Sequence, residues 1–441
     1  MSHDSVSDPR RQFAVEVVKR LSAAGYQALW AGGCVRDLLM SREPGDYDVA
    51  TNATPEQVRQ VFGSRRTIPV GESFGVIIVR GPSPGAGQIE VATFRSEGPY
   101  SDGRRPDHVA YSTAEQDAQR RDFTINGMFY DPVDETILDY VGGEADLKVR
   151  RLRAIGEPHA RIREDKLRML RAVRFAAVLD FELDATTAQA ITDMAAEVTL
   201  VSAERIAQEL QKMLSSPNRR RAIELAESMG LLPVILPELA PIAQASDRAE
   251  WSQTLTALEQ LKVARFELAM AMLLRSLPAA PPPQERRTRP SASDTAEGET
   301  GTVWGICRRL RLSNEQTELI VWLVASQRAV DGIERAEPWQ WKRFLQHPHA
   351  PELLRFLSVL RSVTGEDATS VDYLIDLHHR MTPHEINPPP LVSGDDLKTA
   401  GLRPGPLFRE LLDAVRNAQL NGEVETREQA LAWLHRNAPP E

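Results

Sequence analysis

The amino-acid sequence predicts an α+β fold, in which an N-terminal mixed sheet with helices is followed by an all-helical chain. Apolar runs of strand length, at 28–31 and 47–50, flank a glycine turn, a short apolar helix and a second turn. From Leu231 onward the sequence favours helices alone. A chain of 441 residues is also too long for one compact domain and suits three or four.

The amino-acid composition limits the class of protein but says little about the reaction it could catalyse. Hydrophobic residues make up 42% and charged residues 26%, which is ordinary for a globular protein. The net charge of −9 argues weakly against nucleic-acid binding, so local arginine clusters would have to carry any RNA contact. Two cysteines, Cys34 and Cys307, exclude a disulfide framework or a zinc ribbon and suit a reducing cytoplasm.

The sequence also lacks the usual membrane signals. Its first residues contain no apolar signal core. The longest apolar run, 266–274, is interrupted by Glu267 and is too short to span a bilayer. We therefore expect a cytoplasmic protein without a membrane partner, and the sequence indicates no protein partner.

The stretch from Trp30 to Thr51 contains the first candidate site. Gly32 and Gly33 would let the backbone approach a phosphate without a Cβ between them. Arg36 follows in the predicted short helix and offers a planar fork of donors to a triphosphate oxygen. A Gly-Gly pair alone is a weak signal. Its position between two strands makes a phosphate site the stronger interpretation.

Two acidic residues follow the second turn at a spacing that suits a cation. In a strand, residues i and i+2 point to the same face, so Asp46 and Asp48 would present both carboxylates at one place. Hard cations such as Mg²⁺ bind carboxylate and phosphate oxygens there, and a metal pair can assist phosphoryl chemistry. An Asp-x-Asp pattern alone is more often a solvated turn; its order and spacing after the glycine turn favour the metal site. Glu90, in the strand predicted at 88–94, is either a third metal carboxylate or an ordinary strand-face glutamate.

The remaining N-terminal elements are predicted from periodicity and from cap residues. A helix at 11–24 carries apolar residues at helical spacing and is expected to pack on the sheet. Thr54 caps the next helix. Strands are predicted at 70–79 and 88–94, and the Gly- and Pro-rich stretch 96–111 is predicted to be a loop.

The stretch 120–128 combines an arginine pair with residues that favour turns. Asp122 or Thr124 could cap a helix there. Arg120 and Arg121 could contact a phosphate or a sugar hydroxyl, although adjacent arginines are more often a solvated charge pair.

The stretch 161–181 predicts one amphipathic helix. Its apolar side is formed by Leu167, Leu170, Val173 and Ala177. Asp165 and Arg168 point to the other side as i, i+3 neighbours. The commoner meaning of this pattern is a surface salt bridge, which contributes little to stability.

The alternative is that Asp165 and Arg168 read a nucleotide base. Adenine and cytosine each present an exocyclic amine beside a ring nitrogen acceptor, so a carboxylate and a guanidinium would match them. Guanine and uracil present the reverse pattern. A mismatched buried polar group costs about 1 to 3 kcal/mol, so such a pair would accept ATP and CTP but reject GTP and UTP.

Further along the chain the sequence predicts scaffold rather than chemistry. The stretch 204–210 opens a helix with Ser202 as its cap. Arg219 to Arg221 could contact an RNA backbone, although a solvated arginine run is commoner. The stretch 278–301 is Pro-rich and then rich in Ser, Thr, Glu and Gly, which predicts a disordered linker or a long loop.

Four stretches together carry a resemblance to a known family: 30–51, 120–128, 164–175 and 204–210. They resemble the nucleotidyltransferase core of the polymerase-β superfamily and, more narrowly, the bacterial (class II) tRNA nucleotidyltransferase and poly(A) polymerase family. One departure is Lys166, where many members carry proline. Proline would only preset the first helical turn, so we expect base selection to survive.

The resemblance implies a domain organisation. A polymerase-β-like head would occupy 1–150 and a helical neck with the nucleotide-selecting helix 151–235. A helical body, resembling a degenerate phosphohydrolase region and containing the linker, would occupy 236–385. The tail, 386–441, would bind tRNA through its backbone and shape.

The resemblance also implies an activity. It would be the addition of CMP, CMP and AMP, from CTP and ATP, to the tRNA 3′ end without a nucleic-acid template, with release of pyrophosphate. The alternative is a poly(A) polymerase, or an enzyme that adds only CC or only A. A protein of another class, an RNA-binding protein without catalysis, is disfavoured by the intact Asp46 and Asp48.

The same resemblance assigns roles to individual residues. The catalytic carboxylates would be Asp46, Asp48 and Glu90, with Mg²⁺ held by Asp46 and Asp48. The nucleotide would be bound by Gly32, Gly33, Arg36, Arg121, Asp122, Asn126, Asp165, Arg168, Arg171 and Arg174. Asp122 and Asn126 would lie near the ribose, and Arg171 and Arg174 would contact the triphosphate or brace the base-reading pair.

Overall fold

The structure, a computed structural model, describes residues 8–71, 75–97, 109–263, 265–279, 302–399 and 405–437. The chain divides into two compact units, Met1–Pro237 and Glu238–Glu441. The first unit contains a mixed sheet and a group of helices, and the described part of the second is helical. The finer boundaries expected within each unit stay predictions.

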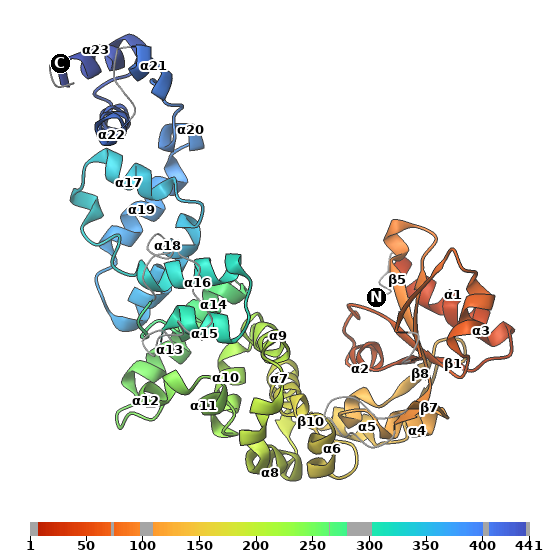
Figure 1. Ribbon diagram of the computed structural model, residues 1–441. Helices are drawn as coiled ribbons and strands as arrows, with labels where there is room; N and C mark the ends of the chain where they lie inside the picture. Colours follow the sequence, from red (N-terminus) through yellow and green to blue (C-terminus); the bar gives the residue numbers. More distant parts are fainter. Residues whose placement is uncertain are drawn as a thin grey trace, which may run out of the picture. The chain divides into compact units, whose positions relative to one another are not determined.

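A seven-stranded mixed sheet forms the centre of the N-terminal part, in the order β3-β4-β5-β2-β1-β8-β9 (Figure 1). The strands are β1 (Ala28–Ala31), β2 (Asp48–Thr51), β3 (Thr67–Gly71), β4 (Val76–Arg80), β5 (Gln88–Thr93), β8 (Phe129–Asp131) and β9 (Thr136–Leu138). The pair β2·β5 is parallel, and every other neighbouring pair is antiparallel. The prediction of a mixed sheet with helices is therefore confirmed.

The two faces of this sheet have different covers. Helices α1 (Pro9–Ala23) and α3 (Pro55–Phe62) pack on the face that carries Trp30 and Val49. The opposite face carries Leu29, Ala31 and Ala50, and it packs against α4 (Ala114–Gln119) and Phe129. Strand alternation explains the division, because neighbouring residues of β1 and β2 point to opposite faces.

Local sequence signals account for the helix ends in this part. The α3 helix begins with a capping box, in which Thr54 Oγ1 accepts from Gln57 N and the Gln57 side chain accepts from Thr54 N. The expected cap at Thr54 is thus confirmed, as is the N-terminal helix. The short helix α2 (Gly33–Leu39) follows β1 directly, where the glycine turn predicts it.

Two predicted elements of the sheet region are wrong. The strand expected at 70–79 is in fact two antiparallel strands, β3 and β4, since the chain reverses between Gly71 and Val76. The stretch 96–111 is not a loop at its ends, because β6 (Arg95–Glu97) pairs with β7 (Val109–Tyr111). Its middle, 98–108, and most of the expected linker, 280–301, lie outside the described residues.

Helices complete the first unit beyond the sheet. They are α5 (Gly143–Lys148), α6 (Pro158–Glu164), α7 (Leu167–Leu179), α8 (Ala185–Met194), α9 (Ala203–Leu214), α10 (Arg219–Ser228) and α11 (Leu232–Ile235). A short parallel pair, β10 (Arg151–Leu152) with β11 (Glu182–Leu183), lies among them. The helices α9 and α10 both pack on α7, whose buried side is the apolar side predicted from the sequence.

The single helix predicted at 161–181 is wrong, because α6 and α7 are separate. The break is at Asp165, whose backbone is extended at φ −149° and ψ 106°. The carboxylate of Asp165 accepts a hydrogen bond from the Leu167 backbone N–H at 3.0 Å, which serves the free amide groups of the new helix start.

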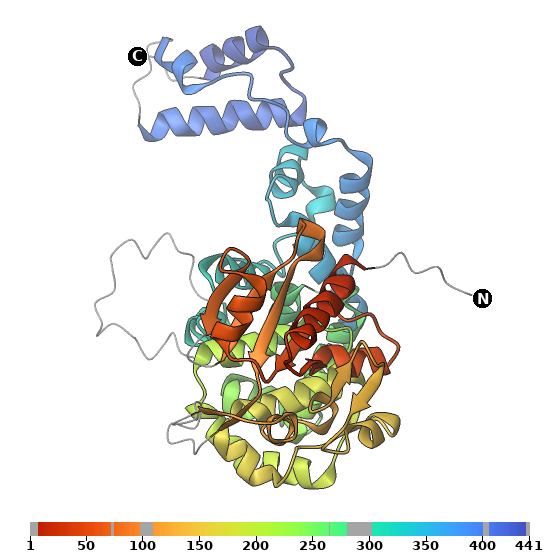
Figure 2. The same cartoon turned by 90° about the vertical axis from the view of Figure 1, so that its right-hand side faces the viewer.

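The second unit is formed by α12 (Ala240–Ala243), α13 (Ala249–Gln260), α14 (Phe266–Leu273), α15 (Val303–Arg309), α16 (Asn314–Ala325), α17 (Pro338–Leu345), α18 (Ala350–Thr364), α19 (Thr369–Arg380), α20 (Pro383–Ile386), α21 (Gly394–Thr399), α22 (Pro406–Asn421) and α23 (Arg427–Asn437). The almost wholly buried α14 packs against α13, α16 and α18. The last three helices share a small core of their own and form one group, drawn in dark blue in Figure 2. In the described part of the chain, no helix is both long and apolar enough to cross a membrane.

Candidate active site

Three acidic side chains come together on the sheet face opposite α1. Asp48 begins β2 and is paired with Glu90 of β5 in parallel register, so the two side chains are neighbours. Tyr47 is buried against Trp30 on the α1 face, with ring centroids 4.8 Å apart. Its two neighbours, Asp46 and Asp48, are exposed instead. Asp46 precedes β2, but the alternation expected of a strand extends to it.

These carboxylates repel one another. Desolvation by the surrounding protein, with repulsion from Asp46 and Glu90, raises the pKa of Asp48 to about 6, although its side chain reaches solvent. Arg121 acts in the opposite direction without cancelling the effect. Among the described residues, no three His, Cys, Asp or Glu side chains are close enough to count as a preformed metal site. The donor set nevertheless suits a divalent cation, which would relieve the repulsion.

The glycine turn beside these acids is required by its geometry. Gly32 has φ 75° and ψ −127°, a conformation that side chains other than glycine rarely adopt. A Cβ at Gly32 would also lie 3.2 Å from Nη1 of Arg121. The turn therefore brings the backbone directly against this guanidinium, where a phosphate can be held from two sides.

A buried acid that the sequence did not single out fixes the arginine pair. Asp117, with 1% of its surface exposed, accepts from Arg120 at 2.7 Å and from Arg121 at 2.9 Å. Burial would raise the pKa of Asp117, but the two guanidinium groups outweigh it and lower the pKa. The solvated charge pair considered for these arginines is therefore wrong. The i, i+3 and i, i+4 spacing on α4 is the signal that could have identified Asp117.

The ribose candidates Asp122 and Asn126 join the sheet region to the α7 helix. Asp122 accepts from Arg171 at 2.5 and 2.9 Å and from Nδ2 of Asn126 at 3.3 Å. Nη1 of Arg36 donates to Oδ1 of Asn126 at 2.8 Å. Four of the predicted residues thus form one connected network. The expectation that Asp122 caps a helix is wrong, because only a 3-10 turn at Thr124–Asn126 follows it.

In this network the pKa of the central acid is lowered, whereas that of Asp48 is raised. Burial would raise the pKa of Asp122, but the charge and hydrogen bonds of Arg171 lower it. Arg36 is only 9% exposed and also contacts Asp37 at 2.8 Å. Arg36 is therefore already oriented by Asn126 and Asp37, whereas the sequence suggested a guanidinium with its donors free for a phosphate.

Three of the predicted arginines lie around the aromatic ring of Phe175. The guanidinium carbons of Arg36 and Arg171 each lie 5.4 Å from the centroid of the Phe175 ring, and that of Arg174 lies 4.0 Å away. These are cation–π distances, and they limit how far each guanidinium can rotate. Phe175 was not predicted as a site residue; its i+4 spacing from Arg171 was the available signal.

The two proposed base-reading residues, Asp165 and Arg168, bind other partners and not each other. Both oxygens of Asp165 accept from Arg205, at 2.7 and 3.0 Å. Nη1 of Arg168 donates to Glu164 at 2.5 Å and to the Arg161 carbonyl at 2.8 Å. The salt bridge between Asp165 and Arg168 that the sequence left open is therefore wrong. Each member is oriented by a residue that sequence reasoning gave no role in the site, Arg205 or Glu164.

Helix α9 braces α7. Nε of Arg174 donates to Glu209, which is 2% exposed, at 2.5 Å, and burial lowers the pKa of Arg174. Ser202 is the N-cap residue by position, but its side chain makes no capping hydrogen bond. Arg221, considered for RNA contact, is paired with Asp180 and Glu182.

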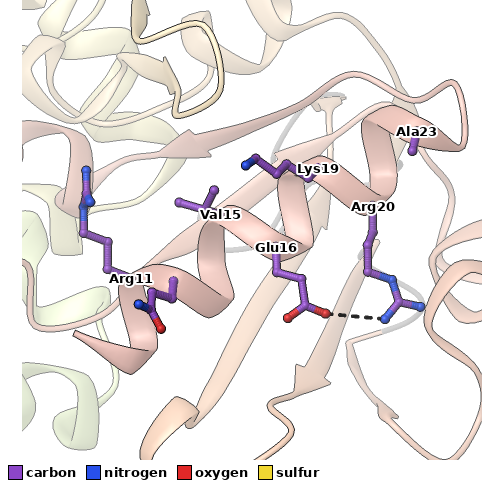
Figure 3. Close-up of a pocket in the computed structure, with 7 residues that line it drawn as sticks. Arg11, Val15, Glu16, Lys19, Arg20 and Ala23 are labelled. Atoms are coloured by element: carbon purple, nitrogen blue, oxygen red, sulfur yellow. Dashed lines mark ion pairs between the residues drawn. The ribbon is translucent and has the colours of Figure 1, made fainter. Parts of the chain in front are cut away.

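A shallow cavity of about 440 Å³ lies elsewhere, along α1 (Figure 3). Residues of this one helix line it, and the figure shows Glu16 paired with Arg20 there. None of the predicted site residues lines it, so we assign it no part in the chemistry.

Two family models match the first half of the chain. Residues 28–153 match the poly A polymerase head domain, which contains the acidic cluster and the arginine pair. Residues 180–242 match the probable RNA and SrmB-binding site of polymerase A.

Similar proteins cover nearly the whole chain. A CCA-adding enzyme of Geobacillus thermodenitrificans (strain NG80-2) is 32% identical over 437 residues, covering 97% of each chain. One from Lactobacillus johnsonii is 42% identical over 221 residues, 49% of this chain and 54% of its own.

Solved structures agree with these sequence relatives. The Bacillus stearothermophilus CCA-adding enzyme in complex with CTP superposes with a TM-score of 0.75 at 29% identity, covering 98% of both chains. The Thermotoga maritima enzyme complexed with tRNA has a TM-score of 0.64 at 19% identity, covering 99% of this chain and 97% of its own. The second likeness shows a shared fold.

The names of these relatives do not favour the alternative of a poly(A) polymerase or a partial nucleotidyltransferase. The relatives and the α+β head with its helical continuation agree with the resemblance found in the sequence. The chain belongs to the CCA-adding enzyme family of nucleotidyltransferases.

Proposed function

We propose that this protein adds CMP, CMP and AMP in turn to the 3′ end of tRNA in the cytoplasm, using CTP and ATP. In each step the terminal 3′ oxygen bonds to the α-phosphorus, the bond to the bridging oxygen breaks, and pyrophosphate leaves with the electron pair. The observation that carries the proposal is the acidic cluster of Asp46, Asp48 and Glu90 beside Arg121 and the glycine turn.

The acidic cluster would hold Mg²⁺. Nucleotidyltransferases generally use divalent metal ions, and a bound Mg²⁺ would lower the pKa of the attacking hydroxyl and neutralise charge on the phosphates. Asp46 and Asp48 would provide the ligands, with Glu90 as a third carboxylate. The raised pKa of Asp48 supports this role, because the charged form is incompletely compensated by the protein alone.

The glycine turn and the arginines would orient the triphosphate. Gly32 and Gly33 leave the backbone accessible, and Arg121 lies directly over Gly32. Asp117 would keep Arg121 fixed in the absence of nucleotide, so that little ordering is needed on binding. Asp122 and Asn126, held together by a hydrogen bond, would contact the ribose.

Base choice would be made by Asp165 and Arg168. A carboxylate has about four lone-pair positions, and Arg205 and the Leu167 N–H use three of those of Asp165, which leaves one for a base amine. Arg168 has five donors, and its contacts to Glu164 and to the carbonyls of Arg161 and Arg120 leave two for a ring nitrogen. Arg171 and Arg174, both beside the Phe175 ring, would contact the triphosphate or brace the base-reading pair.

The tRNA would extend along the chain beyond the head. The family match over 180–242 supports an RNA contact there. The tail, 386–441, would bind the tRNA mainly through its backbone and shape, because the chain as a whole is acidic.

The direct test is extension of a tRNA that ends at the discriminator base. The protein is incubated with each nucleoside triphosphate alone and with CTP and ATP together, and the products are sized. Three added residues that require both CTP and ATP support the proposal. A long adenylate tail would point to a poly(A) polymerase, and a product stopping after CC or accepting only A to a partial enzyme. Retained tRNA binding without any extension would contradict it.

A further inference from the structure

The second unit contains a cavity of about 450 Å³ that the proposed reaction does not use. It is bounded by four helices of this unit, α13, α14, α18 and α19, which lie together in Figure 1. Its volume falls within the range of small-molecule binding sites. The cavity is lined by Gln260, Leu261, Lys262, Val263, Leu268, Pro351, Leu354, Arg355, Ser358, Val359, Ile375, His378 and His379.

The lining of this cavity has two distinct chemistries. Apolar side chains, including Leu354, Val359 and Ile375, provide a surface for a flat, weakly polar group. Lys262 and Arg355 are exposed beside them. All of the lining residues are described, and none of them is acidic. The cavity is therefore amphipathic, with a positive rim.

Within the described residues, neither Lys262 nor Arg355 forms an ion pair. Two acids on the same helices are engaged elsewhere: Glu352 contacts Arg265 at 2.5 Å, and Asp376 is paired with Arg380. Most of the other arginines described in this unit do have partners, so the rim differs from its surroundings.

Helix stabilisation does not explain the rim. His378 and His379 lie in the last turn of α19, where basic groups commonly offset the helix dipole. Arg355, however, lies in the N-terminal half of α18, where the dipole gives a cation no stabilisation. The positive charge at that position therefore suits a ligand better than it suits the fold.

We propose that this cavity is a second nucleotide-binding site, separate from the acidic cluster of the head. Lys262 and Arg355 bind a phosphate, and the apolar lining receives the base. The nucleotide is either an unpaired nucleotide of an RNA strand or a free mononucleotide, because both present the same phosphate and base. Unstacked bases are the usual target of proteins that bind single-stranded RNA.

The test is photo-crosslinking of the full chain followed by mass spectrometry of the digested protein. One arm uses a short single-stranded RNA that contains thiouridine, and the other uses thiouridine monophosphate. We expect labelled peptides from 351–360 or 371–380. Labelling by the RNA alone identifies an RNA contact, and labelling by both probes identifies a site for free nucleotide. Absence of label from both segments in both arms would overturn the proposal.

Two variants sharpen this result. Arg355→Glu removes a phosphate contact and adds repulsion, so labelling should fall by about tenfold. Ser358→Trp fills the cavity without changing its charge and should also reduce labelling. The matched control is Arg328→Glu, which changes an exposed arginine of the same unit that does not line the cavity.

Thermal melting of each variant shows whether it is folded. If Arg355→Glu and Ser358→Trp are folded and are labelled as strongly as Arg328→Glu, the proposal is wrong. The outcome is independent of tRNA extension, because extension depends on the acidic cluster of the first unit. Failure of this proposal can therefore be told from failure of the proposed function.

Discussion

Two groups of acids in the first unit are treated in opposite ways by the fold. On the sheet face, Asp46, Asp48 and Glu90 lie beside one another, and the pKa of Asp48 is raised to about 6. Between the sheet and α7, Asp122 is bound by Arg171 at 2.5 Å and its pKa is lowered. Asp48 on the sheet face therefore lacks a compensating positive charge, whereas the charge of Asp122 is compensated by Arg171.

The difference indicates two separate roles. Acids that repel one another at the surface gain stability from a cation that arrives from outside. Acids that are already paired gain nothing from a cation, but they hold guanidinium groups in fixed positions. We infer that the sheet-face acids serve the reaction, whereas Asp117 and Asp122 orient Arg121 and Arg171, two of the arginines proposed to act on the nucleotide.

The largest effect should follow loss of charge in the acidic cluster. Asp48→Asn keeps the shape but removes a metal ligand, and we expect extension of tRNA to fall by about 10³-fold or more. Binding of tRNA, measured by filter retention, should be unchanged because it depends on other surfaces. An Asp48→Asn protein with near-normal extension would remove the metal assignment and the comparison with it.

The paired acids should instead affect stability. Asp122→Asn weakens the contact with Arg171 and leaves a half-buried guanidinium poorly compensated, so we expect a loss of about 2 to 3 kcal/mol in the free energy of unfolding. Urea titration measures this loss. The control is Asp193→Asn on α8, a more exposed acid paired with His159, which should cost less than about 1 kcal/mol. Equal losses would contradict the assigned role.

The base-reading pair should affect choice rather than rate. Arg168→Ala removes the donor to the ring nitrogen, so discrimination against GTP and UTP should fall by about ten- to hundredfold. Competition assays with all four nucleoside triphosphates measure this ratio. Arg163→Ala, an exposed arginine on α6, is the matched control. If Arg168→Ala leaves the preference unchanged, Arg168 serves only to hold α6 to α7.

The smallest effect concerns stability and pH. The folded-state pKa of Asp48 is raised from 3.8 to about 6, so its contribution to stability is full below about pH 4 and is lost as pH rises through 6. Without metal at pH 7, Asp48→Asn should therefore be more stable by about 1 kcal/mol, a value reduced for solvent screening. Calorimetry at pH 4 should show no difference, and Mg²⁺ at pH 7 should stabilise only the natural protein. A less stable variant at pH 7 would contradict this.

The sequence predicted elements whose signals are local. Helix α3 could be predicted from Thr54 and the residues just after it, and the glycine turn from Gly32 and Gly33. The two acids Asp46 and Asp48 were found because strand alternation acts over two residues.

Features that depend on distant contacts could not be predicted in this way. The break between α6 and α7 occurs where Asp165 is held by Arg205, which is 40 residues away in the chain. The partner of Asp122 is 49 residues away, at Arg171. No local pattern shows which guanidinium will reach which carboxylate, so the pairing of the site residues emerged only from the fold.

The most direct test of this account is the binding of Mn²⁺, a paramagnetic substitute for Mg²⁺, followed by electron paramagnetic resonance. The unsubstituted protein is compared with the variants Asp48→Asn and Asp122→Asn, which carry the same kind of substitution in the two groups of acids. We predict that Asp48→Asn loses the bound ion and that Asp122→Asn keeps it. Equal binding by both variants, or loss only in Asp122→Asn, would contradict the division of these acids into cation ligands and arginine holders.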